Sequence, residues 1–304
     1  MAARHPDVSP LLRAVRAARG MTLVGLVACA AVAHAPAAAR GAGGTPVAAA
    51  TIPNGGARFW FDPAVPLGAP PATALVNDNG SPRILVPRHY ADFRRTLAGQ
   101  LSSWAADPRL SLNPNFVAAL LAKESGFDPR ATSAVPANGI AQMTHIADAD
   151  LRIIAREAPQ FRWMLPEVEG WPRLPAVHDS AATKAKTDAL LASGAVSGTN
   201  EYLFEPALAL RASMFWLRIL ATIWMEDQWP GQHGALARDK LGKGGRLPEE
   251  ELLALVTVSY NQGHPYVADL VTKYGRGWRD HLNEESGDYL ERIVAYTEIF
   301  QRAR

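Results

Sequence analysis

Residues 116–129 read FVAALLAKESGFDP and have the apolar spacing of an amphipathic helix that ends in a glycine turn. Asn113 and Pro114 come just before this stretch. An asparagine caps the free amides at a helix start, and proline fits the first helical position. Gly126 suits the C-terminal stop. We therefore expect a helix from Asn115 to Ser125.

An acidic residue lies on the apolar side of this predicted helix. The apolar stripe consists of Phe116, Val117, Leu120 and Leu121. Glu124 follows the last two of these by four and three residues, so it projects from the same face. A carboxyl beside an apolar wall is expected to have a raised pKa, as a general acid needs. The alternative is a glutamate in the last turn that reaches solvent.

The rest of the chain also favours helices. Beyond Pro87, amphipathic patterns predict a mostly α domain without sustained strand alternation or internal repeats. Residues 158–202 are rich in proline at first and then weakly helical, and the segment 150–202 has the length of an insertion. The expected helices are 88–106, 115–125, 139–157, 206–228, 248–261, 264–274 and 287–302.

The composition excludes several classes of protein. The chain has 304 residues, 31 basic and 29 acidic side chains, and 48% hydrophobic residues. These values exclude a wholly disordered chain and argue against a dedicated nucleic-acid binder. A single cysteine, Cys29, cannot form an intrachain disulfide or a cysteine-based metal site. The histidines show no ligand spacing, and we expect no metal and no cofactor.

The N-terminus has the pattern of an export signal. Four arginines precede a charge-free apolar run of 13 residues from Met21 to Ala33. A membrane span needs about 20 apolar residues, so this run fits the core of a signal peptide instead. We assign residues 1–35 to the signal and expect the mature protein in the periplasm or cell envelope. Cleavage after Ala35 or Ala39 is one alternative.

Cys29 offers another way of processing the signal. Residues 26–29 read LVAC and resemble a bacterial lipobox, whose cysteine is lipidated and anchors the protein to a membrane. The alternative is that Cys29 is a small apolar residue of the signal core. Residues 34–87 contain nine prolines and seven glycines, so we expect a flexible linker over 36–87 and a folded domain over 88–304.

Residues 116–129 resemble the catalytic helix of the soluble lytic transglycosylases, the glycoside hydrolase family 23 type with a lysozyme-like, goose-type fold. In that family a Glu-Ser pair precedes a phenylalanine and an Ala-x-Ser…Gly-Ala-x-Gly-Leu-Met-Gln segment. The matching positions here are Ala131, Ser133, Ala137, Gly139 and Gln142. The chain departs from the pattern at Pro136, Ala141 and His145.

Three later fragments resemble further motifs of the same family. Phe204-Glu205-Pro206, followed by 214–217, is similar to the Asp-Pro…Tyr-Leu helix. Residues 259–263, SYNQG, are similar to Ala-Tyr-Asn-x-Gly, and residues 285–289, ESGDY, to the terminal Glu-Thr-x-x-Tyr. Together the fragments cover residues 112–295 in the family's order.

The resemblance implies a mechanism with one carboxyl group. Glu124 would protonate the glycosidic oxygen between N-acetylmuramic acid and N-acetylglucosamine and then activate the C6 hydroxyl, which gives a 1,6-anhydro product without water. Tyr260 would orient Glu124 or the N-acetyl group, although an ordinary core tyrosine is the alternative. Ser125 would hydrogen-bond the carboxylate or the substrate, with a plain helix-end serine as the alternative, and Gln142 would contact a sugar amide.

Several alternatives stay open. Asn261 is either a substrate contact or a helix C-cap, and Asp128 is expected in the turn before Pro129 rather than as a second catalytic carboxylate. We expect a monomer that acts on peptidoglycan glycan strands. A non-catalytic peptidoglycan-binding or assembly factor with the same fold, or a lysozyme-type hydrolase, are the competing functions.

Overall fold

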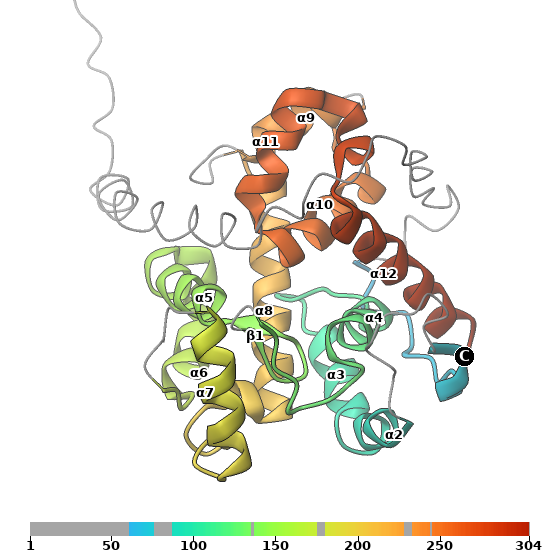
Figure 1. The fold of residues 1–304 in the computed structure, drawn as a ribbon. Helices are drawn as coiled ribbons and strands as arrows, with labels where there is room; N and C mark the ends of the chain where they lie inside the picture. The colour runs from blue at the N-terminus through green and yellow to red at the C-terminus, as the bar shows by residue number, and fades with distance from the viewer. Residues whose placement is uncertain are drawn as a thin grey trace, which may run out of the picture.

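The computed structural model describes residues 61–75, 87–134, 137–174, 180–227, 233–243 and 245–303 (Figure 1). The predicted signal over 1–35, with Cys29, and the predicted linker outside residues 61–75 and Pro87 lie outside these described residues.

The described residues fold mainly into helices, which confirms the mostly α class. The α-helices are α2 (Pro87–Thr96), α3 (Ala98–Ala105), α4 (Pro114–Ser125), α5 (His145–Glu157), α6 (Leu165–Gly170), α7 (Ser180–Ala192), α8 (Pro206–Met225), α9 (His233–Leu241), α10 (Glu249–Gln262), α11 (His264–Tyr274) and α12 (Glu284–Arg302). Short 3-10 turns are η2 (Ala72–Leu75), η3 (Pro159–Met164), η4 (Tyr202–Phe204) and η5 (Gly275–His281). Strands β1 (Ala137–Asn138) and β2 (Met143–Thr144) form an antiparallel hairpin.

Helix α8 runs through the centre of the fold (Figure 1). Pro206 occupies its first turn, and the Glu205 side chain accepts a hydrogen bond from the Leu208 amide, which caps the helix start. Among the described residues, α8 alone is long and apolar enough to cross a membrane by length and composition. Because 83% of its apolar window is buried inside the domain, the composition matches that of a core helix.

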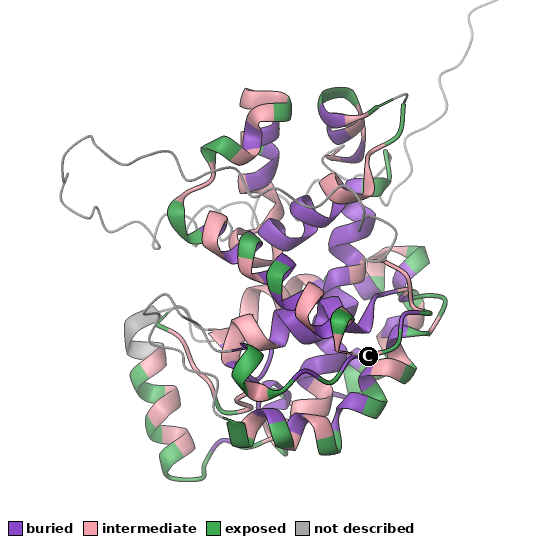
Figure 2. Cartoon of the chain, turned by 90° about the vertical axis from the view of Figure 1, so that its right-hand side faces the viewer, coloured by how far each residue is buried: buried purple, intermediate pink, exposed green. Residues whose placement is uncertain are grey.

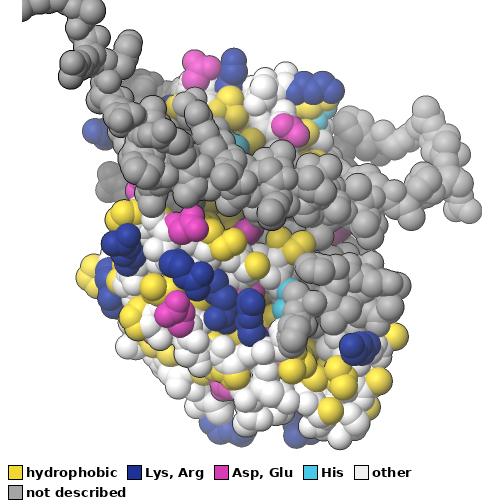
Figure 3. Space-filling model, turned by 90° about the vertical axis from the view of Figure 1, so that its left-hand side faces the viewer, with side chains coloured by type: hydrophobic (Ala, Val, Ile, Leu, Met, Phe, Trp, Pro, Cys, Tyr) yellow, Lys and Arg dark blue, Asp and Glu magenta, His cyan; other side chains and the backbone are white. Residues whose placement is uncertain are grey.

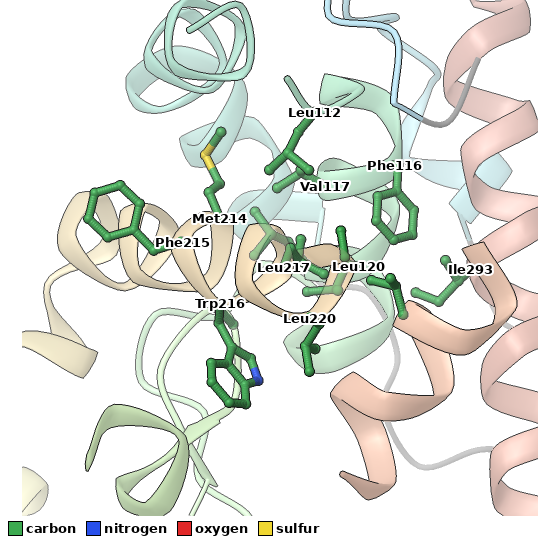
Figure 4. Close-up of a cluster of buried hydrophobic side chains, with 14 of the residues drawn as sticks. Leu112, Phe116, Val117, Leu120, Met214, Phe215, Trp216, Leu217, Leu220 and Ile293 are labelled. Atoms are coloured by element: carbon green, nitrogen blue, oxygen red, sulfur yellow. The ribbon is translucent and has the colours of Figure 1, made fainter. Parts of the chain in front are cut away.

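Helix α4 packs along α12, and its apolar side chains join those of α8 in one buried cluster (Figure 4). Figure 2 shows buried residues gathered in the centre of the molecule. Leu120 faces Leu217 and Leu220 of α8, and Phe116 lies near Ile293 of α12 (Figure 4). The predicted helix over 115–125 is confirmed and begins one residue earlier, at Pro114. The expected apolar stripe is fully buried, so the helix is fixed by packing along most of its length.

Two of the predicted helices differ clearly from the structure, whereas the bounds of the others agree within three residues. The helix expected over 88–106 is divided at Leu97 into α2 and α3. The helix expected over 139–157 begins only at His145, because Gly139 (φ 73°) and Gln142 (φ 49°) have left-handed backbone that a right-handed helix cannot contain. The hairpin therefore takes the place of the first turns, and the Thr144 side chain caps α5.

Residues 61–75 pack on the domain, so this part of the expected flexible linker belongs to the fold. The Asn115 side chain accepts a hydrogen bond from the Gly68 amide (2.9 Å) and donates one to the Pro66 carbonyl (3.0 Å). The Ala69 amide donates to the Ala303 carbonyl at 2.9 Å. A side chain at position 68 would collide with the backbone of α12, which explains the glycine there. The sequence pattern misses these contacts because they join distant parts of the chain.

The segment 150–202, which we expected as an insertion, folds into the lobe of α5, α6 and α7 (Figure 1). Its anchor is Asp148, whose side chain is 1% exposed. This carboxylate accepts hydrogen bonds from Arg152 (2.9 Å), Arg173 (2.7 Å) and the Tyr202 hydroxyl (2.8 Å). Figure 3 shows Lys and Arg side chains gathered on this side of the molecule beside a few acidic ones.

Candidate active site

Glu124 lies in the last turn of α4 and is half-buried. The helix ends directly afterwards because Gly126 has left-handed backbone (φ 61°) and returns its amide to the carbonyls of Leu121 and Ala122. Glu124 therefore stands at the point where the buried helix reaches the surface. Its carboxylate contacts another helix, so it is not a fully solvated glutamate at the helix end.

The contact on Glu124 comes from Tyr289 of α12. The Tyr289 hydroxyl donates a short hydrogen bond to Glu124 Oε1, and the tyrosine is only 3% exposed. Burial raises the pKa of Tyr289 well above its usual value, and the negative charge of Glu124 and the hydrogen bond to it raise it further. The phenol therefore stays protonated and remains a donor to the carboxylate.

Tyr289 is the functional residue that sequence reasoning missed. It belongs to the fragment 285–289 that resembles Glu-Thr-x-x-Tyr, but the fragment served only to identify the family. The clue was present on α12, where Tyr289 shares the inner face with Ile293 and Phe300. Only the packing of α12 along α4, 165 residues away in sequence, shows which carboxylate the tyrosine meets.

Tyr260 lies on α10, close enough for the Glu124 charge to affect it. Burial raises its pKa well above the usual value, and the Glu124 charge adds to this. Its hydroxyl, however, donates to the Ala141 carbonyl at 2.8 Å. Tyr260 therefore holds the hairpin segment beside Glu124, whereas the hydrogen bond that orients the carboxylate comes from Tyr289.

Ser125 also binds this hairpin segment. Its hydroxyl donates to the Ile140 carbonyl at 2.7 Å, so α4 and α10 hold two consecutive carbonyls, those of Ile140 and Ala141. The expected bond from Ser125 to the carboxylate or a sugar stays a prediction beside this contact. The side chains of Ser125 and Tyr260 thus position residues 139–142, which form one wall of the site.

Gln142 is buried within the same segment. Its amide nitrogen donates to the carbonyls of Ala131 and Gly139, each at 3.0 Å. Its amide oxygen is buried and has no hydrogen-bond partner within the described part of the chain. Gln142 therefore ties the turn at Gly139 to the Ala131 backbone.

Asn261 and Asp128 form hydrogen bonds with residues close to them in sequence. The Asn261 amide oxygen accepts a hydrogen bond from the neighbouring Gln262 at 2.8 Å. Gly263 caps α10, so Asn261 is not the helix C-cap. The Asp128 carboxylate accepts a hydrogen bond from the Arg130 amide at 2.8 Å in the turn around Pro129, as the sequence predicts. Glu124, Tyr260, Ser125 and Gln142 thus gather around residues 139–142, together with Tyr289.

The family comparison matches part of this arrangement. The model of the transglycosylase SLT domain matches residues 103–157, which include Glu124, Ser125 and Gln142. The comparisons with curated proteins and with solved structures return no match. The matched segment spans α4, the hairpin and α5 within a mostly helical fold, and this family points to lytic transglycosylase activity on peptidoglycan. Residues 103–157 are therefore similar to the transglycosylase SLT domain, and the mostly helical fold around them is consistent with a lysozyme-like domain of the soluble lytic transglycosylase type.

Proposed function

We propose that this protein is a peptidoglycan lytic transglycosylase. It would cleave the β-1,4 bond between N-acetylmuramic acid and N-acetylglucosamine and leave a 1,6-anhydro-muramic acid end. The observation that carries the proposal is the half-buried Glu124, which lies in the last turn of a buried helix within the matched segment and accepts a hydrogen bond from the Tyr289 hydroxyl.

Glu124 would act twice in the reaction. In the first step its proton passes to the glycosidic oxygen, and the bond from that oxygen to the anomeric carbon of the muramic acid breaks. In the second step the Glu124 carboxylate takes the proton of the C6 hydroxyl, whose oxygen then bonds to the anomeric carbon. The carboxyl group returns to its protonated form, and no water is consumed.

Tyr289 would hold the carboxyl group in place through both steps. Its hydroxyl donates a hydrogen bond to Oε1 of that carboxyl group. Since the pKa of Tyr289 is raised, the phenol does not compete as a proton source for the reaction. A fixed carboxyl oxygen reduces the entropy lost when the substrate and the acid are brought together.

The carboxylates close to Glu124 support a mechanism with one acid. Glycosidases that use two carboxyl groups need the second one free beside the scissile bond. Asp288 is held by Lys123 at 2.8 Å and by Arg292 at 2.7 Å, and Asp128 binds its own turn. Neither is placed as a nucleophile or base, which favours the anhydro product over hydrolysis.

The wall of residues 139–142 would bind the sugar. Gln142 would contact the amide of an N-acetyl group, which is present on both sugars of the glycan strand. Ser125 and Tyr260 would fix the position of this segment, because their hydroxyls donate hydrogen bonds to its carbonyls. Asn261 would contact the strand from the end of α10.

We also propose that the enzyme works in the cell envelope, where its substrate is located. Support comes from the sequence pattern of an export signal and from Cys29 in its lipobox-like setting. Metabolic labelling with a fatty-acid probe tests the anchor. Incorporation that is lost in Cys29→Ala supports lipidation, and export without incorporation supports simple cleavage of the signal.

Digestion of purified sacculi tests the activity. Wild type should release anhydro-muropeptides, identified by mass spectrometry, whereas Glu124→Gln should release none. Glu298→Gln is a matched control, since Glu298 forms an exposed pair with Arg302 on α12 far along the helix from Tyr289. Binding of sacculi by wild type without release of any product would instead support a non-catalytic binding factor.

A further inference from the structure

A three-residue charge cluster lies directly beside Glu124 and has no role in the steps above. Lys123 Nζ is 2.8 Å from Asp288 Oδ2, and Arg292 Nε is 2.7 Å from Asp288 Oδ1. Each oxygen of Asp288 therefore binds one cation. The side chains of Lys123 and Arg292 are only 19% and 13% exposed, so solvent screens these charges less than those of an ordinary surface pair.

The cluster and the acid form two adjacent cross-links between α4 and α12. Lys123 binds Asp288, and the next residue on each helix forms the second link, from Glu124 to Tyr289. The Lys123 ammonium also lies 5.9 Å from the centre of the Tyr289 ring. A change in the first link is therefore transmitted to the hydroxyl that holds Glu124.

The cluster also determines the charge around Glu124. From α12 the titratable groups near it are Tyr289, Asp288 and Arg292, from α10 Tyr260, and from α4 itself Lys123. Helix α3 and the hairpin contain no titratable side chain, α8 brings leucines to α4, and Asp128 and Arg130 follow in the turn. Within the cluster itself, the two cations exceed Asp288 by one positive charge.

The pKa of Asp288 agrees with this arrangement. Burial by itself raises the pKa of the carboxyl, but the hydrogen bonds and positive charges of Lys123 and Arg292 lower it more, so it lies below the usual value. Asp288 therefore stays ionised over the range in which a carboxyl acid such as Glu124 titrates. Its charge is a constant part of the surroundings of the acid.

We propose that Lys123, Asp288 and Arg292 form a positioning cluster that sets the proton affinity of Glu124 and keeps Tyr289 on its carboxylate. The inference rests on the proposed function and extends it to residues outside the site. An excess of positive charge would make Glu124 a stronger acid that is deprotonated too early, and a deficit would have the reverse effect.

Charge-changing variants test the cluster. Asp288→Asn adds one net positive charge near Glu124, and Lys123→Met removes one. We expect opposite shifts in the titration midpoint of Glu124, downward for Asp288→Asn and upward for Lys123→Met, each on the order of 0.5 pH units. The double variant restores the net charge and should return the midpoint towards wild type, and Lys123→Arg should keep it.

Two readouts are needed. One is the NMR titration of carboxyl-labelled glutamate in the whole protein, with the Glu124 resonance assigned by its loss in Glu124→Gln. The other is the alkaline limb of the pH profile for release of anhydro-muropeptides. Glu298→Gln removes a carboxylate from the same helix and should move neither.

Opposite shifts that cancel in the double variant support the cluster. Shifts of the Glu124 titration midpoint in the same direction for both single variants would overturn it. Loss of thermal stability with an unchanged midpoint would also overturn it, because a purely structural link does not depend on the sign of the charge that is removed. The NMR titration does not need turnover. Opposite shifts in a protein that releases no product would therefore refute the proposed function while leaving the electrostatic role of the cluster intact.

Discussion

Replacing Tyr289 with phenylalanine removes the hydroxyl that holds Glu124 and leaves the ring in place. A hydrogen bond to a charged group contributes about 1.5–3 kcal/mol. If that energy is lost from the transition state, kcat/KM falls about 10- to 100-fold, since each 1.4 kcal/mol or so corresponds to a factor of ten. The ring is 3% exposed and keeps its packing, so the unfolding free energy should fall by only about 1 kcal/mol.

The assay is the initial rate of anhydro-muropeptide release, followed across pH and paired with urea unfolding. Because Tyr289 donates to the ionised form of Glu124, its loss should also move the alkaline limb of the profile to higher pH. Tyr90→Phe is the matched control, since Tyr90 is buried and donates to the Pro70 carbonyl away from the site. Equal rates in wild type and Tyr289→Phe would refute the orienting role, as would equal losses in both variants.

Three further predictions concern the surrounding scaffold. Asp148→Ala leaves the poorly exposed Arg152 without its carboxylate and should lower the unfolding free energy by about 3–5 kcal/mol, measured by urea denaturation; a loss below about 1 kcal/mol would contradict the anchor. Burial raises the pKa of Asp150 to about 6, so the folded protein holds this proton more tightly and loses stability as pH rises from about 4 through 6. Asp150→Asn should therefore stabilise the protein by about 1–3 kcal/mol at pH 7 and little at pH 4, and an equal gain at both would contradict the burial. Asn115→Ala should speed amide exchange over 61–75, seen by mass spectrometry, and unchanged protection there would show that other contacts hold this segment.

The parts of the fold that depend on neighbouring residues could be predicted from the sequence. Asn113, Pro114 and Gly126 give the start and end of α4 because capping and left-handed backbone are local properties. The same reasoning placed Glu124 on the buried side, where α12 meets it. Helix α11 has the predicted bounds because His264 and Tyr274 lie beside glycines at both ends.

The parts that depend on distant contacts could not be predicted in the same way. No local pattern shows that Tyr289 bonds to Glu124 or that Tyr260 bonds to the Ala141 carbonyl. Residues 61–75 have the composition of a flexible linker, yet Asn115 and the end of α12 bind them. The spacing of the hairpin residues predicts a helix. The left-handed backbone of Gln142 prevents one, and the spacing alone does not show this.

The central claim is that Glu124 cleaves the strand without water, and the most direct test is digestion of sacculi in water enriched with heavy oxygen. A transglycosylase closes the C6 hydroxyl onto the anomeric carbon, so the new muramic acid ends should be lighter by one water and carry no heavy oxygen. Glu124→Gln should give no such ends. Muramic acid ends with a free reducing group that contain heavy oxygen would contradict the account, because water would then have been the nucleophile.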